Sequence, residues 1–404
     1  MSYPVTAAHT IFALNKSIMA LKVSDYGESV VFCKDYGDIS VKGVSSGGLV
    51  VRYEFERYQE GIIDTLEETY HPNKNGQVRI KGVGEMARRN APVWAFSTQK
   101  GLEAYRYASV NLNMSFSSGE DNASLKRRFL YADVATEGMH YQGISECFLT
   151  RYSTRRILPG QPVTLAFHFN GRQTLSVGVA YIDRPGHAAY VSWPVGLDNG
   201  QLEDGVEQYF IHKADCITVM DRLNEETQGE FAEDDMLWYT FTLQTEDGAE
   251  DTVRFEVDHR KYPVTSILLY QNCFGLSESI ALHGVETVTA EMEGTFGTMG
   301  QAYRKIFTWL DYVHESNTGY LGPDDREAFE DLLRSPKVYL GSVAEENEVV
   351  ITETDAEEVL PHAGPVNFKV KWKRVNASYR RFRNKAVAAT DTGVFDRSFD
   401  KSFE

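Results

Sequence analysis

Residues 253–284 read VRFEVDHRKYPVTSILLYQNCFGLSESIALHG, and this stretch decides the fold class. Residues 253–257 alternate apolar and charged side chains, which is the period of a strand with one buried face. Pro263 ends that run because proline cannot donate to a sheet ladder. Residues 266–270 are almost wholly apolar, as in a strand covered on both faces, and residues 279–282 run back after a glycine turn. The stretch therefore predicts three strands of a β-sandwich core.

The composition describes an acidic chain with ample material for hydrophobic cores. It has 404 residues, which suggests two or three domains, and 42% of them are hydrophobic. Acidic residues outnumber basic ones, 58 to 41, so the formal net charge is −17. Because binding of phosphates needs a basic surface, we do not expect nucleic acid as the main partner. The balance suits a component of an abundant assembly.

Neither the N-terminus nor the cysteines indicate export. Residues 1–23 lack a charged segment followed by a continuous apolar one, so no secretory signal is expected. No stretch reaches the roughly 18 apolar residues of a membrane span. The four cysteines form no C-x-x-C pair, and they are Cys33, Cys147, Cys216 and Cys273. We expect buried free thiols of a protein folded in a reducing cytoplasm, with no metal site and no disulfide framework.

Working outward from the central stretch, residues 1–116 are expected to form a first β-sandwich domain. Short strands alternate there with glycine-rich turns. Residues 70–80, YHPNKNGQVRI, give a turn followed by a strand, and residues 81–89 give a short helix. Residues 117–121, SSGED, are expected to be a linker.

A glycine motif within this first domain needs an interpretation. Gly82, Gly84 and Ala87 match G-x-G-x-x-A after a short strand. A dinucleotide site would need a βαβ unit, and residues 91–94 contain a proline that breaks any long helix. We therefore interpret the motif as a strand-to-helix turn and not as a nucleotide site.

Residues 122–285 are expected to form a second β-sandwich or jelly-roll domain. Residues 163–182 predict a hairpin around Asn-Gly, and residues 237–257 predict another around Glu-Asp-Gly. Residues 216–220 are interpreted as a strand, and the acidic residues 223–236 as a loop. Many short strands at turn-punctuated spacing are typical of such folds.

Residues 286–376 are expected to form a small α+β module. A helix begins at Pro323, where two aspartates lie at its positive end, and stops before Pro336. Three strands follow, over residues 337–340, 348–352 and 367–375. In the last strand the buried positions are predicted to be Phe368, Val370 and Trp372, and the exposed ones Lys369, Lys371 and Lys373.

Charge is segregated in this part of the chain. Residues 345–358 carry acids and no base, and residues 368–385 carry bases and no acid. Three interpretations stay open: a pair of solvated surfaces, complementary contacts between neighbouring copies of an assembly, or contact with nucleic acid. The candidate residues for electrostatic contacts between subunits are Lys369, Lys371, Lys373, Arg380, Arg381 and Arg383.

Residues 377–404 are expected to be a basic segment that ends in an extended aromatic tail. The end of the chain, FDRSFDKSFE, repeats F-D-x-S-F twice, so Phe395, Phe399 and Phe403 recur at every fourth residue. A free tail is usually disordered. Three large apolar anchors on a polar peptide also fit docking onto another subunit.

No motif for catalysis is present in the sequence. Residues 275–279, GLSES, lack the closing glycine of a nucleophile elbow. The ten histidines show no H-x-x-x-H or H-E-x-x-H spacing, and the acidic loops fit no calcium site. We therefore expect no enzyme activity, no catalytic residue, no metal and no cofactor.

Several segments resemble virion structural proteins of crAss-like phages, which infect Bacteroidales. They are ILLYQNCFGLSESIALHG at 267–284, LLRSPKVYL at 332–340, EVVITET at 348–354, NFKVKWKRV at 367–375, the end FDRSFDKSFE and the early YHPNKNGQVRI. The resemblance implies a tail, portal-ring or baseplate component, assembled with copies of itself in a ring and with other tail or portal proteins. It implies a virion protein made in the bacterial cytoplasm, without membrane contact.

A second function class stays open from the sequence. A carbohydrate-binding or receptor-binding β-sandwich could stack sugar rings on exposed aromatic side chains. The candidates are Trp193, Trp238 and Tyr239. A role in the core is also expected for such residues, because aromatic side chains bury large areas.

Overall fold

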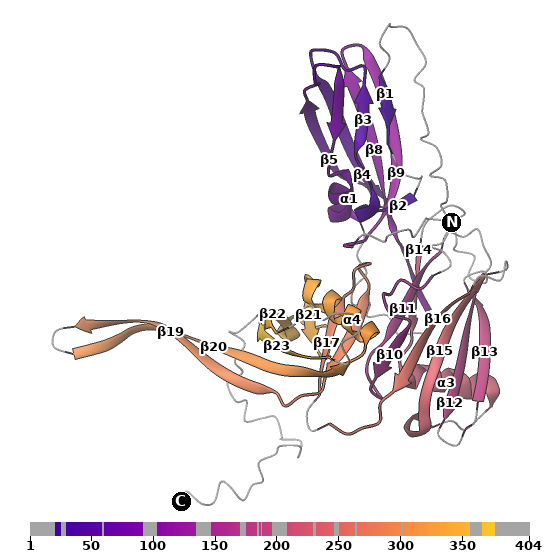
Figure 1. Cartoon of the computed structure of the whole chain (residues 1–404), viewed down its shortest axis with the longest axis vertical. Coiled ribbons are helices and arrows are strands. Elements are labelled where there is room, and N and C mark those ends of the chain that lie inside the picture. Colours follow the sequence, from indigo (N-terminus) through magenta and orange to yellow (C-terminus); the bar gives the residue numbers. More distant parts are fainter. Residues whose placement is uncertain are drawn as a thin grey trace, which may run out of the picture.

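The computed structural model describes residues 21–25, 30–58, 60–91, 103–134, 147–169, 175–183, 186, 188–195, 208–228, 232–245, 250–262, 265–299, 302–355 and 366–375. These residues lie mainly in β-strands, as the sequence predicts, and their strands form five sheets. Figure 1 shows an upright β body at the N-terminal end, a second β body below it, and a long two-stranded arm that projects sideways.

Two sheets share the hydrophobic core of the N-terminal body. The smaller sheet has the order β1 (Lys22–Ser24), β3 (Ile39–Lys42), β6 (Gln77–Ile80). The larger has the order β2 (Val30–Phe32), β9 (Asp121–Leu130), β8 (Ser109–Ser118), β4 (Leu49–Arg57), β5 (Gly61–Tyr70). Val41 and Ile80 from the first sheet lie in one buried cluster with Tyr53 and Phe116 from the second. Alternation of apolar residues along each strand supplies this core.

The expected linker at residues 117–121 is instead the turn of a hairpin. Strands β8 and β9 pair antiparallel along their whole length, from Ser109 opposite Leu130 to Ser118 opposite Asp121. Gly119 adopts φ 65°, a left-handed conformation that favours glycine in tight hairpin turns. The sequence SSGED therefore marks a hairpin turn and not a domain linker, and the first β body continues through β9.

The G-x-G-x-x-A motif is a strand-to-helix turn, as predicted. Gly82 has φ 74° and precedes α1 (Val83–Asn90), which follows β6. A Cβ on Gly84 would lie 2.0 Å from the carbonyl oxygen of Cys33, in the short helix η1 (Cys33–Asp35). Ala87 is fully buried. The small residues therefore let α1 pack directly against η1.

The second body also combines two sheets. One has the order β10 (Thr154–Ile157), β16 (Glu250–Val257), β15 (Met236–Thr245), β12 (Leu175–Asp183), β13 (Ala188–Val195), and the other β11 (Thr164–Phe169), β14 (Gln208–Lys213), β7 (Glu103–Tyr107). The predicted pairing of β15 with β16 is confirmed. The predicted hairpin over 163–182 is wrong, because β11 pairs with β14 and β12 pairs with β13 and β15. Leu165, Ala166 and Phe167 are all buried, so β11 is covered on both faces.

A helix replaces the strand and part of the loop expected over residues 216–236. α3 (Cys216–Thr227) begins after Asp215, whose carboxylate accepts a hydrogen bond from the amide of Thr218 at 3.0 Å. Its buried residues are Cys216, Val219 and Leu223, which is helical spacing. The short helix η2 (Glu233–Asp235) then leads into β15. The N-cap and the helical spacing of the buried residues together explain why this segment is a helix and not a strand.

The seven-stranded sheet joins the central stretch to the C-terminal elements. Its order is β18 (Ser277–Leu282), β17 (Ser266–Gln271), β21 (Val338–Leu340), β22 (Glu348–Thr354), β23 (Val366–Arg374), β20 (Ala302–Leu321), β19 (Thr287–Met299). All three strands expected in the central stretch are present. However, β16 belongs to the five-stranded sheet of the second body, whereas β17 and β18 belong to this sheet, which crosses the boundary expected after residue 285.

The turn between β17 and β18 touches the other parts of the molecule. The side-chain oxygen of Asn272 accepts hydrogen bonds from the amides of Phe274 and Leu276, both at 3.0 Å. The ring of Phe274 lies 5.5 Å from that of Phe32 in the N-terminal body. The same buried cluster includes Ala166 of β11. The stretch that decides the fold class therefore also lies where the two bodies and the seven-stranded sheet meet.

One face of the seven-stranded sheet is covered by α4 (Pro323–Arg334), which begins at the predicted proline. Phe329 of α4 stacks on Phe368 with ring centroids 5.1 Å apart. The predicted burial of Phe368, Val370 and Trp372 is confirmed. Of the three lysines between and after them, Lys369 is exposed and the other two are half-buried.

Candidate functional site: a projecting β-arm

Strands β19 and β20 form an arm that the sequence interpretation did not identify. They pair antiparallel from Thr287 opposite Glu315 to Met299 opposite Ala302. The 13 residues of β19 span about 44 Å at the usual rise of a strand. Strand β23 pairs with β20 only from His314 onward, so among the described residues the rest of the arm is a two-stranded ribbon. Figure 1 shows it extending away from both β bodies.

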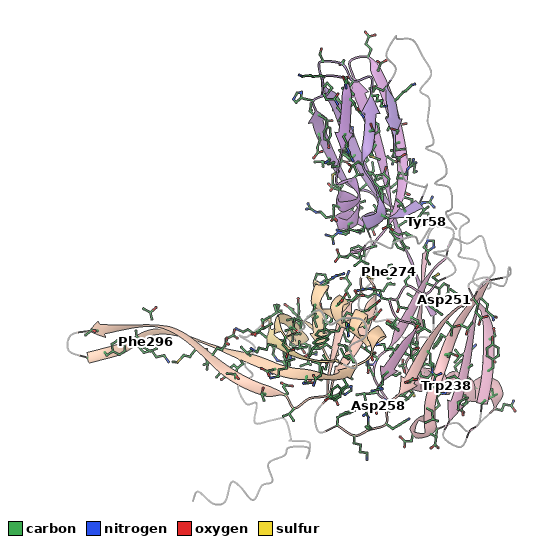
Figure 2. The ribbon with its side chains drawn as sticks, in the orientation of Figure 1. Tyr58, Trp238, Asp251, Asp258, Phe274 and Phe296 are labelled. Carbon is green, nitrogen blue, oxygen red and sulfur yellow. The ribbon has the colours of Figure 1, made fainter. Side chains whose placement is uncertain are left out.

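One face of this arm is apolar and exposed. In a strand, alternate residues share a face, and directly opposed residues on paired strands share it too. The apolar face carries Val288, Met292 and Phe296 from β19 and Tyr303 and Leu310 from β20, all between 41% and 74% exposed. One charged residue shares this face: Lys305 lies opposite Phe296, and its Nζ lies 3.1 Å from Sδ of Met292. The rings of Phe296 and Tyr303 stack at 6.1 Å, and Figure 2 places Phe296 on the distal part of the arm.

The apolar face is an extension of the core of the seven-stranded sheet. Val288 lies opposite His314, and His314 lies opposite Trp372. Trp372 is fully buried, and the His314 ring stacks on it with centroids 4.0 Å apart. Glu286 accepts a hydrogen bond from Nδ1 of His314 at 2.5 Å. One cross-strand row therefore runs from the buried Trp372 through His314 to the exposed Val288.

The opposite face of the arm is charged, and it contains the lysines predicted for contacts between subunits. Lys373 pairs with Asp311 at 2.9 Å and with Glu291 at 3.0 Å. Hydrogen bonds to these two acids raise the pKa of Lys373, and the hydrogen bond from Lys373 lowers the pKa of Asp311. Lys371 pairs with an acid of β22 at 2.7 Å. These ion pairs tie the base of the arm to β22 and β23.

The remaining predicted site residues have different positions. Lys369 lies 3.5 Å from Glu315 of β20, so all three lysines of β23 have partners within the chain. Their contact with a second copy stays a prediction. The other predicted residues lie outside the described residues, and they are Phe395, Phe399, Phe403, Arg380, Arg381 and Arg383.

A cavity of about 160 Å³ lies where β10 and β16 meet β18, β20 and α4. Asp258 on its wall pairs with Arg260 at 2.6 Å and accepts a hydrogen bond from the Tyr262 hydroxyl at 2.7 Å. Burial raises the pKa of Asp258, but these hydrogen bonds outweigh it and lower the pKa overall. Burial lowers the pKa of His283, whose ring stacks on Tyr262. Asp325 receives a hydrogen bond from the amide of Gly322 and caps α4.

The acids of this cavity are therefore committed to local partners. Figure 2 shows Asp258 at the lower edge of the molecule, between the second body and the base of the arm. A catalytic acid or base needs a side chain that reaches a substrate proton. Here the carboxylate of Asp258 is held by a guanidinium and a phenol, and the carboxylate of Asp325 caps α4. The arrangement therefore primarily joins two sheets.

A buried ion pair beside the cavity strengthens the same junction. Arg155 of β10 donates to Glu278 of β18 at 3.1 Å and also to the carbonyl oxygen of Ser279. Tyr270 and Asn272 donate to the two carboxylate oxygens of Glu278 at 2.9 and 2.8 Å. Burial raises the pKa of Glu278, and Arg155 opposes part of that rise. All of these hydrogen bonds are made within the protein, so we interpret the Arg155–Glu278 pair as structural.

The aromatic residues considered for sugar stacking do not form an open platform. Tyr239 is fully buried, and its hydroxyl donates to the carbonyl oxygen of Ala214. The guanidinium of Arg254 lies 4.4 Å from the centre of the Trp238 ring. The side chain of Trp193 lies outside the described residues. Tyr239 is therefore a core residue, and one face of Trp238 is covered.

The described part of the chain offers neither a metal cluster nor a membrane-spanning helix. No group of three or more His, Cys, Asp or Glu side chains there is placed to hold a metal ion. No helix in that part is long and apolar enough to span a membrane. No disulfide joins the four cysteines, all of which lie in described segments: Cys33, Cys216 and Cys273 are buried and Cys147 is half-buried. Burial raises the pKa of Cys33 and of Cys273.

The signal for the arm was present in the sequence. Residues 287–299 read TVTAEMEGTFGTM, and apolar or small residues occupy every second position from 288 to 296. That is strand periodicity, with threonines and glutamates at the positions between, and the small residues at 290 and 294 weaken the apolar signal. Comparisons with known proteins add nothing to this geometry, because no family model and no curated protein matches the chain.

Proposed function

We propose that this chain is a non-enzymatic structural subunit of a tailed-phage virion. Copies would associate in a ring of the tail, the portal vertex or the baseplate, together with other tail or portal proteins. The observation that carries the proposal is the arm with its exposed apolar face. An isolated two-stranded ribbon is marginally stable in water, and exposed apolar patches of this kind mark interaction surfaces.

The rest of the architecture is compatible with such a role. We infer that each β body, with two sheets around a shared core, acts as a rigid sandwich unit of the subunit. The arm would contact the next copy, and repeated contacts of one kind close into a ring. The resemblance of several segments to crAss-like phage virion proteins supports the proposal of a virion assembled from proteins made in the bacterial cytoplasm.

A carbohydrate-binding or receptor-binding role is the second candidate, but no observed feature favours it. The stacking residues it would need include the buried Tyr239, and Arg254 covers one face of Trp238. Stacking on a sugar ring requires an accessible aromatic face. The apolar arm instead favours a protein partner.

The test is the oligomeric state of the full-length protein and of two matched valine variants. Val288 on the apolar arm face and Val350 on the opposite face of the same sheet are 51% and 53% exposed. Val350 lies opposite Lys373, which identifies its face. We expect wild-type protein and Val350→Asp to form rings in negative-stain images and a multimer by light scattering, and Val288→Asp to lose them. A wild-type protein that stays monomeric at high concentration, or equal behaviour of the two variants, contradicts the proposal.

A further inference from the structure

Among the described residues, the outer edge of β19 is an unpaired sheet edge. In the seven-stranded sheet β19 is the last strand, and its only partner among the described residues is β20. Its outward N–H and C=O groups can therefore accept another strand, and proteins commonly recognise an extended peptide in this way. An added strand would also lie beside the exposed apolar face.

We propose that residues 395–403 from the tail of a second copy add as a strand to the outer edge of β19. The proposal rests on the proposed assembly function and names the partner of its arm. Phe395, Phe399 and Phe403 would lie on the apolar face, each beside one apolar residue of β19. The tail and the arm are thus two halves of one contact.

The spacing of the two segments carries the argument. On β19 the large apolar residues of the exposed face are Val288, Met292 and Phe296, at every fourth position. In the tail, phenylalanines also recur at every fourth position. Residues four apart on a strand share a face and lie about 13 Å apart. Two paired strands can therefore match all three apolar positions at once, in either relative direction, and the central pair is Met292 with Phe399 in both.

The residues between these positions are also complementary in size. Ala290 and Gly294 lie between the apolar residues of β19, on the same face. In the tail the equivalent positions are Arg397 and Lys401. Long basic side chains extend their aliphatic stems over neighbouring apolar surface while keeping the charge in water. A small residue beside each of them leaves room for that stem.

A second copy is the occupant that fits an assembling subunit. Strand β23 ends at Arg374, and residues 375–394 span up to about 65 Å when extended, which is enough to leave the chain's own body. Arm and tail are different surfaces, so pairing them between copies is a head-to-tail contact. Such contacts repeat around an axis and close into a ring. A short strand of three anchors then gains strength from the number of contacts in the ring.

Cysteine cross-linking of the full-length protein tests the pairing. One variant carries Met292→Cys and a second carries Phe399→Cys, both in a Cys147→Ser background, because Cys147 is the one native cysteine that is not buried. Directly opposed residues on paired strands are close enough for a disulfide. We expect a dimer band on a non-reducing gel when the two variants are mixed under mild oxidation. The matched control, Val350→Cys mixed with Phe399→Cys, is expected to give none.

A chain that carries both Met292→Cys and Phe399→Cys distinguishes the occupants. Docking between copies gives a ladder of linked multimers, and docking onto the chain's own arm gives an internally linked monomer. The monomer, or equal cross-linking in the Val350 control, overturns the proposal. Negative-stain images of the same samples separate the two proposals. Rings without the Met292–Phe399 cross-link contradict only this strand pairing. The absence of both rings and cross-links contradicts the pairing and the proposed assembly function together.

Discussion

Truncation of Trp372 to alanine is expected to destabilise the seven-stranded sheet by about 3–5 kcal/mol. The side chain is fully buried between α4 and the sheet, and its ring stacks on His314. A tryptophan buries roughly 150–250 Å², which at about 25 cal/mol per Å² corresponds to about 4–6 kcal/mol of transfer free energy. An unpaired N–H lowers the expected loss, because Nε1 of Trp372 is buried with no hydrogen-bond partner among the described residues, and such a group costs about 1–3 kcal/mol.

The same unpaired group provides the matched control. Trp372→Phe keeps an aromatic ring in the core and removes the N–H that has no acceptor in the described part of the chain. We therefore expect a much smaller loss of stability, below about 1.5 kcal/mol, as for other substitutions that keep most of the volume. The pair of variants separates the packing of the ring from the hydrogen bonding of the indole.

Hydrogen exchange measured by mass spectrometry reports the effect strand by strand. A loss of 3–5 kcal/mol corresponds to roughly a hundred- to several-thousand-fold faster exchange of amides in β20 and β23. Amides of β4 and β8 in the N-terminal body should keep their protection and serve as an internal reference. Unchanged exchange in β20 and β23, or an equal effect of Trp372→Phe, would refute the reasoning.

Three further changes test other parts of the molecule. Gly84→Ala forces a methyl group against the carbonyl of Cys33 and should cost about 1–3 kcal/mol, visible as a lower melting temperature. Arg155→Met should cost about 3–5 kcal/mol near neutral pH by leaving Glu278 buried without its counter-ion. Because the folded pKa of Glu278 lies above its ordinary value, the stability from this group is full below that value and falls as pH rises. The cost should therefore shrink at acidic pH in denaturant titrations, and a cost that grows there would be contrary evidence. Deleting residues 392–404 should leave the circular dichroism unchanged and abolish assembly, whereas normal assembly would exclude tail docking.

Local patterns predicted the elements whose burial follows directly from spacing. The alternation in β23 gave the correct buried positions, because every second side chain of a strand faces the same side. Of the three lysines predicted to be exposed, only Lys369 is, because ion pairs partly cover the other two. Pro323 correctly marked the start of α4. The glycine motif at Gly82 and Gly84 was correctly assigned to a turn, since no βαβ unit surrounds it.

Other features could not be predicted because they depend on pairing between distant residues. Nothing local to β11 indicates that it pairs with β14 and not with β12. Nor does the central stretch reveal that β16 and β17 belong to different sheets. The α3 helix is a different case, since the cap at Asp215 and the helical spacing of Cys216, Val219 and Leu223 were readable and were outweighed by the β-rich surroundings.

The length of β20 has a mechanical consequence for the molecule. This strand of 20 residues runs without a break from the distal part of the arm into the seven-stranded sheet, and α4 follows it directly. A pull along the arm is therefore delivered to the sheet through one covalent chain. Because the load runs parallel to β19 and β23, it shears many ladder hydrogen bonds at once, whereas a sideways pull at the tip would peel them apart singly. The arm is stiff along its axis and yields across it.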